Sequence, residues 1–172
     1  MSEPLKLDEQ KKSNWFRPHR KCGLYIGVTK YDQVSIKKNA ATIQLFRNVS
    51  DVEKNVVDFK ACMEKYGIKG EDAICLIDKS SKDVDTAVND LSKKLRVAKK
   101  NSPVENILTV FLFAGRGMIF EGYQVLLYDE YDPINGFFKK FVAEKKICSW
   151  AEIYHNTYIL CIISCDRNIH NP

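Results

Sequence analysis

Two short segments of the sequence place reactive or charged residues directly after apolar runs. The first is Ala-Gly-Arg-Gly at 114–117, which closes the most hydrophobic stretch of the chain, residues 106–115. The second is Ser-Cys-Asp-Arg-Asn at 164–168, which closes the apolar run at 158–164. In open sheets of parallel strands, functional groups gather outside the carboxyl ends of the strands. If the two runs form neighbouring strands, these segments meet at one edge and form the candidate site.

The residue types in these segments favour charge pairing over proton transfer. A guanidinium stays protonated in proteins, so Arg116 cannot take a proton from a nucleophile. Asp166 carries the opposite charge, and we expect the two to hold the strand ends together. The alternative is that Arg116 lowers the pKa of the Cys165 thiol and produces a reactive thiolate, although an inert thiol is the simpler interpretation. His155 is a candidate base for activating the Cys165 thiol, but it precedes the last apolar run, and this position disfavours that role.

The elements that position this site follow from hydrophobic periodicity. Steps of four and three predict two amphipathic helices. Their apolar stripes are Val52, Val56, Phe59, Met63 and Tyr66 in the first, and Val84, Val88, Leu91, Leu95 and Ala98 in the second. Asp51 can cap the start of the first helix and Gly67 its end, and Asn101 with Pro103 closes the second.

Short apolar runs between these helices predict strands. They cover residues 23–31, 73–78, 106–115 and 158–164, with a hairpin at 118–128 and an aromatic-rich helical segment near 137–142. The polar stretch 32–48 is predicted as a connection. Strands that alternate with helices imply parallel pairing with helices on both faces, so we expect an α/β sandwich with a central strand at 106–115 that is buried on both faces.

Composition limits the classes of function. The 172 residues carry 27 basic and 22 acidic side chains, a net charge of +5 that is too mild and too dispersed to predict nucleic-acid binding. The lysine and arginine cluster at 93–100 falls on a predicted helix end, where it favours the helix dipole. Six cysteines without a Cys-x-x-Cys pair or matching histidines are typical of reduced core thiols, so we expect neither a metal site nor a cofactor.

The sequence contains no apolar window long enough to span a membrane. Its first twenty residues are polar and fit neither a secretory signal nor an ordinary transit peptide. We therefore predict an intracellular, cytoplasmic protein, with an uncleaved mitochondrial signal as the alternative. Residues 1–20 are expected to form a polar arm, and residues 21–172 a single domain.

Four stretches of the sequence resemble the large-subunit portion of the caspase, metacaspase and paracaspase clan. LYIGVTKY is similar to the first strand of that fold and NVSDVEKNVVDFKACMEKYGI to its first helix and turn. FLFAGRGMIFEGYQVLLYDE resembles the strand and hairpin around the catalytic histidine, and CIISCDRNIHNP the strand that ends in the catalytic cysteine. The resemblance spans roughly residues 22–172, and it implies a caspase-like three-layer sandwich with a mostly parallel sheet.

The same resemblance implies a defective active site. Arg116 stands where active members hold the histidine that serves as general base. Aligning Arg167 with the arginine that follows the nucleophile puts Asp166 in the nucleophile position, whereas a slip of one residue would put Cys165 there. Gly117 corresponds to the glycine whose amide helps to form the oxyanion hole. His19 and His170 are assigned no role.

The resemblance also implies that the sheet is incomplete, because active members continue with small-subunit strands after the cysteine strand. The last strand would then present an apolar edge that another chain or the N-terminal arm covers. Its residues are Tyr158, Ile159, Leu160, Ile162 and Ile163. We therefore predict a pseudoenzyme that serves as a structural or regulatory subunit of a protein assembly. The alternatives are a cysteine peptidase that uses Cys165 and is completed by a partner chain, and a decoy regulator of an active relative.

Overall fold

The computed structural model describes most of the domain in seven stretches of chain. They cover residues 18–31, 35–38, 41–44, 48–120, 123–132, 137–141 and 144–166. The predicted N-terminal arm lies outside them up to residue 17, and the first strand already begins at Arg20.

A sheet of four parallel strands forms the centre of the molecule. These strands are β1 (Arg20–Gly27), β4 (Ala73–Ile77), β5 (Ile107–Phe120) and β8 (Thr157–Asp166). Their order is β4-β1-β5-β8, so β5 has β1 on one side and β8 on the other. The end of β5 continues into two antiparallel strands, β6 (Tyr123–Asp132) and β7 (Phe137–Phe141).

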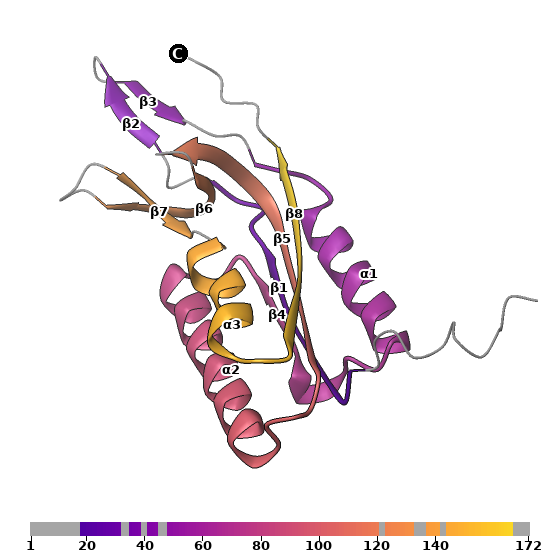
Figure 1. Ribbon diagram of the computed structural model, residues 1–172. Coiled ribbons are helices and arrows are strands. Elements are labelled where there is room, and N and C mark those ends of the chain that lie inside the picture. Colours follow the sequence, from indigo (N-terminus) through magenta and orange to yellow (C-terminus); the bar gives the residue numbers. More distant parts are fainter. Residues whose placement is uncertain are drawn as a thin grey trace, which may run out of the picture.

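Helices cover both faces of this sheet, as Figure 1 shows with the strands seen edge-on. Helix α1 (Val52–Lys65) lies on one face, and α2 (Ser81–Asn101) and α3 (Ser149–Ile153) lie on the other. A short 3-10 turn, η2 (Gly70–Asp72), precedes β4, and a π-helical turn, η3 (Glu144–Cys148), leads into α3. The predicted three-layer α/β sandwich with a mostly parallel, open sheet is confirmed. Within the described residues, no helix combines the length and the apolar character needed to cross a bilayer.

The two long helices form where the periodicity predicted them. Helix α2 buries all five residues of its predicted stripe, and a capping box between Ser80 and Asp83 fixes its start. Helix α1 buries Val52 and Val56, but its predicted stripe is one residue too long, since Tyr66 lies beyond the helix and is exposed. Asp51 occupies the N-cap position without a capping hydrogen bond from its side chain.

Gly67 ends α1 in the left-handed conformation, with φ of 86°. That conformation is nearly free of strain for glycine alone, which explains why the helix stops there. The predicted end signal is confirmed.

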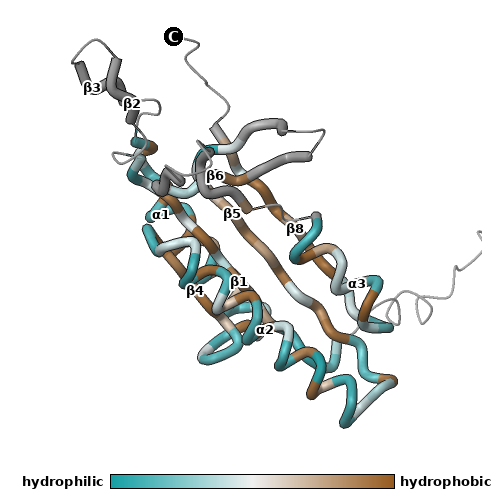
Figure 2. The backbone as a smooth tube through the Cα atoms, turned by 90° about the vertical axis from the view of Figure 1, so that its left-hand side faces the viewer, coloured by the Kyte–Doolittle hydropathy of each residue, from teal (hydrophilic) through white to brown (hydrophobic). Residues whose placement is uncertain are grey.

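Each face of the sheet carries its own apolar cluster. Residues of β1 and β5 alternate between the faces, so Leu24, Ile26 and Phe111 pack toward α2, whereas Val110 and Leu112 pack toward α1. The middle of β5 is therefore buried on both faces, as the sequence predicted. Figure 2 shows the hydrophobic residues that run along β1, β5 and β8.

Two predictions about the connections are wrong. The aromatic segment predicted as a helix near 137–142 is strand β7, which pairs with β6, and the helical turns begin at Glu144. The spacing of its phenylalanines suits either element, and the adjacent strand decides the outcome, because aromatic residues pack well across strands. The stretch 32–48, predicted as a plain connection, contains a hairpin of β2 (Ser35–Lys38) and β3 (Ala41–Gln44).

Candidate functional site

The last residues of the parallel part of β5 lie beside the carboxyl end of β8. These strands pair in parallel over ten positions, and the last two pairs match Gly115 with Cys165 and Arg116 with Asp166. Residues in register on neighbouring strands share the same pleat. Position 166 is thus the strand neighbour of Arg116, whereas Cys165 neighbours a glycine, which has no side chain.

Arg116 is buried at this edge, with 6% of its surface exposed. Its backbone amide points toward the β1 side of β5, because the carbonyl of Ala114, two residues earlier, accepts the Val28 N–H on that side at 3.0 Å. Strand β1 itself has ended at Gly27. Strand β1 therefore offers no carbonyl group to the Arg116 N–H. A buried N–H group without an acceptor lowers the stability of the folded state.

The side chain of Tyr31 supplies the missing acceptor. Its hydroxyl accepts the Arg116 N–H at 2.7 Å and donates to the Leu127 carbonyl of β6 at 3.4 Å. The Tyr31 N–H in turn donates to Asn48 Oδ1 at 2.8 Å. A single tyrosine therefore fastens the end of β5 to β6 and to the segment that precedes α1.

Burial keeps the Tyr31 phenol in its protonated form. Desolvation is the main cause that raises its pKa well above the ordinary tyrosine value, and the hydrogen bond from the Arg116 amide offsets part of this effect. The hydroxyl can then donate and accept at any physiological pH. No sequence pattern indicated this role, because a lone tyrosine after a strand is not diagnostic of any site.

Gly115 is required by the close approach of this tyrosine. A Cβ atom at position 115 would lie 2.7 Å from the Tyr31 hydroxyl and 3.1 Å from the Val28 carbonyl oxygen. Both distances are shorter than ordinary contacts to carbon. The first glycine of Ala-Gly-Arg-Gly therefore serves the packing of Tyr31.

A second set of hydrogen bonds fixes the ends of β1 and β4. The Asp78 carboxylate accepts from the Thr29 N–H at 2.6 Å and from the Thr29 hydroxyl at 2.5 Å. The Asp78 N–H donates to the Gly27 carbonyl at 2.8 Å. Asp78 has φ of 48°, a left-handed conformation that aspartate tolerates better than most residues. The loop that carries Tyr31 is thereby held from both sides.

The remaining residues predicted for the site are Cys165, Gly117 and Asp166. Cys165 is half-buried and packs against the cluster on the α2 side, to which Tyr31 also belongs. Gly117 is buried and begins the antiparallel pairing with β6, opposite Leu126. The structure describes the backbone of Asp166, so an ion pair with Arg116 stays a prediction.

The histidines of the described residues lie far from this edge. His155 is exposed and precedes β8, and the ten residues of that strand put it about 30 Å from the carboxyl end. His19 precedes β1 and accepts the Asn106 N–H at 3.0 Å. His170 lies outside the described residues. Neither described histidine can act on Cys165.

Cys22 is buried and Cys75 is half-buried, but Cys62 is exposed, so the prediction of core thiols does not hold for every cysteine. Cys22 is buried beside Thr109, 3.3 Å from its hydroxyl, and desolvation raises the pKa of the thiol to about 11. Burial also raises the pKa of Cys75. Across the described part of the chain, no group of three histidine, cysteine or carboxylate side chains has a metal-binding arrangement.

Strand β8 is the second feature of functional interest. Among the described residues it pairs with β5 alone, so its outer edge has no strand beside it. Ile159 and Ile163 pack partly against the α2-side cluster, and Ile162 against the α1-side cluster. Tyr158 and Leu160 are 46% and 47% exposed. Between Thr157 and Cys165 the strand carries no charge and no proline, the usual protection of an open edge.

No protein-family model matches the chain, and no curated protein matches its sequence.

Proposed function

We propose that this protein is a catalytically inactive caspase-like protein that serves as a structural or regulatory subunit of a larger assembly. The observation that carries the proposal is the buried Arg116 at the carboxyl end of the central strand, where the resemblance expects a histidine base. A permanently protonated guanidinium cannot activate a thiol by accepting its proton.

The register of β5 and β8 supports a structural role for this arginine. Position 166 shares a pleat with Arg116, whereas Cys165 shares one with Gly115. The guanidinium is therefore better placed to pair with an acidic neighbour at 166 than to lower the pKa of the Cys165 thiol. In this proposal the charge pair replaces a catalytic dyad and closes the former site.

The exposed part of β8 supports a role in assembly. A long apolar edge strand pairs readily with a strand of another chain, since its outward N–H and C=O groups need partners. The exposed side chains of Tyr158 and Leu160 would be covered in the same contact. An unrelated partner would favour the subunit role, and a partner of the same fold would favour the decoy alternative.

The closure of the site is tested with a double-mutant cycle of Arg116→Met and Asp166→Asn. We expect a coupling free energy of about 1–3 kcal/mol in the free energy of unfolding. A coupling near zero would contradict the charge pair.

The absence of catalysis is tested on the same protein with a thiol-directed acyl probe. We expect no acylation of Cys165, while a plain alkylating reagent labels the exposed Cys62 and shows that the protein is accessible to reagents. Acylation at Cys165 would restore the peptidase hypothesis.

The assembly role is tested by native mass and by partner content after charged substitution. Ile162→Lys and the more exposed Leu160→Lys should both reduce association, because a lysine opposes strand pairing at an edge. Val57→Lys is the matched control, since Val57 on helix α1 is also apolar and is as exposed as Leu160, at 47%. Unchanged complexes with both β8 variants would contradict the proposed surface.

A further inference from the structure

Backbone groups at the outer edge of β8 point away from the sheet at alternate residues. The Ile107 N–H of β5 donates to the Asn156 carbonyl at 3.0 Å, and Ile107 is in register with Thr157. Because backbone groups alternate in direction along a strand, the even-numbered residues of β8 face β5 and the odd-numbered residues face outward. The outward residues of the strand are Thr157, Ile159, Cys161, Ile163 and Cys165.

The outward residues are arranged symmetrically about Cys161. An antiparallel neighbour pairs outward residues with outward residues, so a second β8 can align with the first with Cys161 opposite Cys161. Ile159 then lies opposite Ile163, and Leu160 lies opposite Ile162. A twofold contact requires such self-complementarity, and here aliphatic residues meet aliphatic residues on both sides of the axis.

The symmetric alignment uses nearly the whole edge. Each of its three central pairs exchanges two main-chain hydrogen bonds. At each end the Cys165 N–H can donate to the Thr157 carbonyl of the other copy, whereas the Thr157 N–H already donates to the Tyr154 carbonyl at 3.1 Å. The total is about eight main-chain hydrogen bonds, within the range of about 5–15 found in specific interfaces. Moving the centre by one residue would leave an end residue of each copy outside the contact.

Two large apolar side chains gain cover in this contact. Tyr158 and Leu160 are 46% and 47% exposed, and they share the α1-side face of β8 with Ile162. On that face a second β8 places Ser164 beside Tyr158 and Ile162 beside Leu160, with Cα atoms about 4.5 Å apart in each pair. The contact therefore removes exposed apolar surface from water, which favours association.

The outer edge carries no charge that would repel a second copy. From Thr157 to Cys165, β8 contains only apolar and neutral polar residues. A charged edge would select a partner of the opposite charge and would repel its own copy, since a twofold axis repeats every charge. Asp166, the charged residue of β8, falls opposite Asn156 in the symmetric alignment. A neutral and symmetric strand is therefore better suited to its own copy than to a charged segment.

The charged side chains near the amino end of β8 are compatible with the twofold contact. Lys146 points to α2, where it pairs with Asp85, and Glu152 and His155 are exposed. In an antiparallel contact the two amino ends lie at opposite ends, so the two copies of Thr157 are about 26 Å apart. Equivalent charges near these ends are thus separated by well over the Debye length of about 8 Å.

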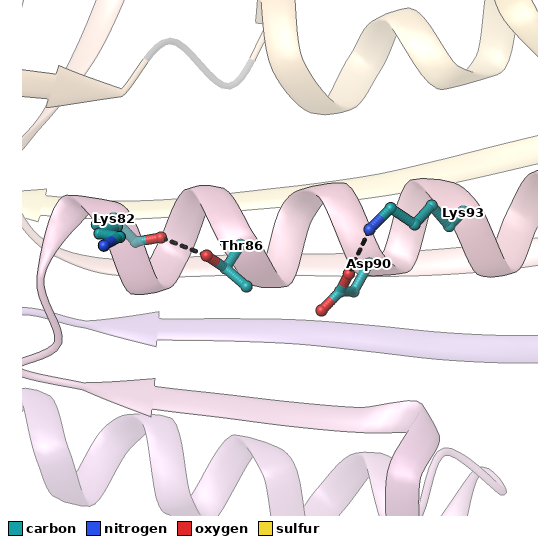
Figure 3. A network of polar contacts seen from close by, with 4 residues as sticks. All are labelled: Lys82, Thr86, Asp90 and Lys93. Atoms are coloured by element: carbon teal, nitrogen blue, oxygen red, sulfur yellow. Dashed lines mark hydrogen bonds and ion pairs between the residues drawn. The ribbon is translucent and has the colours of Figure 1, made fainter.

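Strand β4, the outer strand on the other side of the sheet, lacks these properties. It has five residues, and Asp72 and Asp78 stand directly before and after it. Helix α2 beside it carries further charges, such as the ion pair of Asp90 with Lys93 in Figure 3. A short strand with charged residues around it is the usual protection of an edge. Of the two outer strands, β8 is therefore the one that a second copy can extend.

We infer that two copies of this chain pair through the outer edges of β8, antiparallel and with Cys161 on the twofold axis. The inference rests on the proposed function, which assigns this edge to association, and it names the partner at the edge as a second copy of the chain. The sheet then continues from one copy into the other. A second copy is compatible with the subunit role, because the decoy alternative requires an active relative as the partner.

Sedimentation of the purified full chain tests the pairing, and Cys161 offers a charge test that is specific to the axis. We expect a species of twice the mass of the chain. Cys161→Lys and Cys161→Asp should each weaken the dimer at least about tenfold, because equal charges then meet on Cα atoms about 5.5 Å apart. An equimolar mixture of the two variants should restore the dimer, since opposite charges then meet. Val57→Lys, on an exposed apolar residue of α1, should leave the dimer unchanged.

Oxidation of the native thiol provides a measurement that does not depend on the folding of the charged variants. A Cα separation of about 5.5 Å is within the range that a disulfide can bridge. In a Cys62→Ser background, which removes the exposed thiol, we expect copper-phenanthroline to link two chains through Cys161, as peptide mapping would show. Cys161→Ser should lose the link and still sediment as a dimer.

The outcomes separate this inference from the proposed function. A purified chain that sediments as a monomer at about 100 µM, well above the dissociation constants of specific interfaces, would overturn the inference. If its β8 variants still lost other partners in extracts, the proposed function would stand. A dimer that persists in both Cys161→Lys and Leu160→Lys, or a disulfide between the copies through a different cysteine, would also overturn the inference.

Discussion

The middle of strand β5 and the end of its parallel part are both buried, but for different reasons. In the middle, Phe111 is fully buried between strands on both sides and apolar clusters on both faces. At the end, Arg116 is almost as buried, but β1 is gone and the Tyr31 hydroxyl takes the place of the missing strand. Burial alone does not distinguish core from site. The two positions differ in the group that forms hydrogen bonds with their backbone: a neighbouring strand at Phe111, and a tyrosine side chain at Arg116.

The largest effect is expected in the middle of the strand. Phe111→Ala should lower the free energy of unfolding by about 3–5 kcal/mol, because it leaves a cavity where Phe111 stacks against Phe141 of β7. Denaturant unfolding measures this loss. Val104→Ala, on an exposed side chain, should change the value by less than about 0.5 kcal/mol. Similar losses in both variants would mean that the core assignment is wrong.

The next effect distinguishes the end of the strand from its middle. Gly115→Ala should cost about 2–3 kcal/mol, because the new Cβ displaces the Tyr31 hydroxyl from the Arg116 amide. The same substitution in a Tyr31→Ala background should cost less, since the displaced group is absent. Equal costs in the two backgrounds, measured by denaturant unfolding, would remove Tyr31 from the explanation.

A smaller effect isolates the hydrogen bond itself. Tyr31→Phe keeps the ring and removes the acceptor of the Arg116 N–H, so we expect a loss of about 1–2 kcal/mol. Hydrogen exchange should show faster exchange at the Arg116 amide than at the Phe111 amide in this variant. If the Arg116 amide kept its protection, another acceptor would have to satisfy it.

The sequence predicted the parts of the molecule that repeat a pattern. Apolar spacing located α1 and α2, and continuous apolar runs located β1, β4, β5 and β8, because these elements bury a face or both faces. The alternation signal is absent from the β2–β3 hairpin, which is mostly polar, and the phenylalanines of β7 fit a helical stripe as well as a strand. In these two segments, tertiary pairing decided what local pattern could not.

Only the part of the site that depends on the order of the strands could be predicted from the sequence. Gly115, Arg116 and Cys165 follow apolar runs, so their meeting at one edge followed from parallel pairing. Tyr31 and Asp78 act through loops whose paths depend on contacts between distant segments, such as the hydrogen bond from Tyr31 to Asn48. No local pattern encodes such contacts, since each partner is an ordinary loop residue.

The smallest expected effect concerns the buried thiol of Cys22 on the central strand β1. Cys22 on β1 has its pKa raised from 9.0 to about 11 by burial, so the native state holds this proton more tightly than the unfolded state. Its stabilising contribution is complete below pH 9 and is lost as pH rises toward 11. We expect about 1 kcal/mol of lost stability between pH 8 and pH 10 from this thiol. Cys22→Ala should unfold with a shallower alkaline dependence, and an identical slope would contradict the assignment.

The place of β1 between β4 and β5 also bears on the order in which the sheet assembles. The β2–β3 hairpin, α1 and η2 separate β1 from β4, whereas β5 lies beyond β4 and the further long helix α2, and closing the longer loop costs more entropy. The Tyr25 amide points toward β4, and the Leu24 and Ile26 amides point toward β5. In a refolding chain, adjacent residues of one strand would then gain protection at different times, Tyr25 before its neighbours. The alternate amides of β1 would then gain protection from hydrogen exchange in two successive steps of folding.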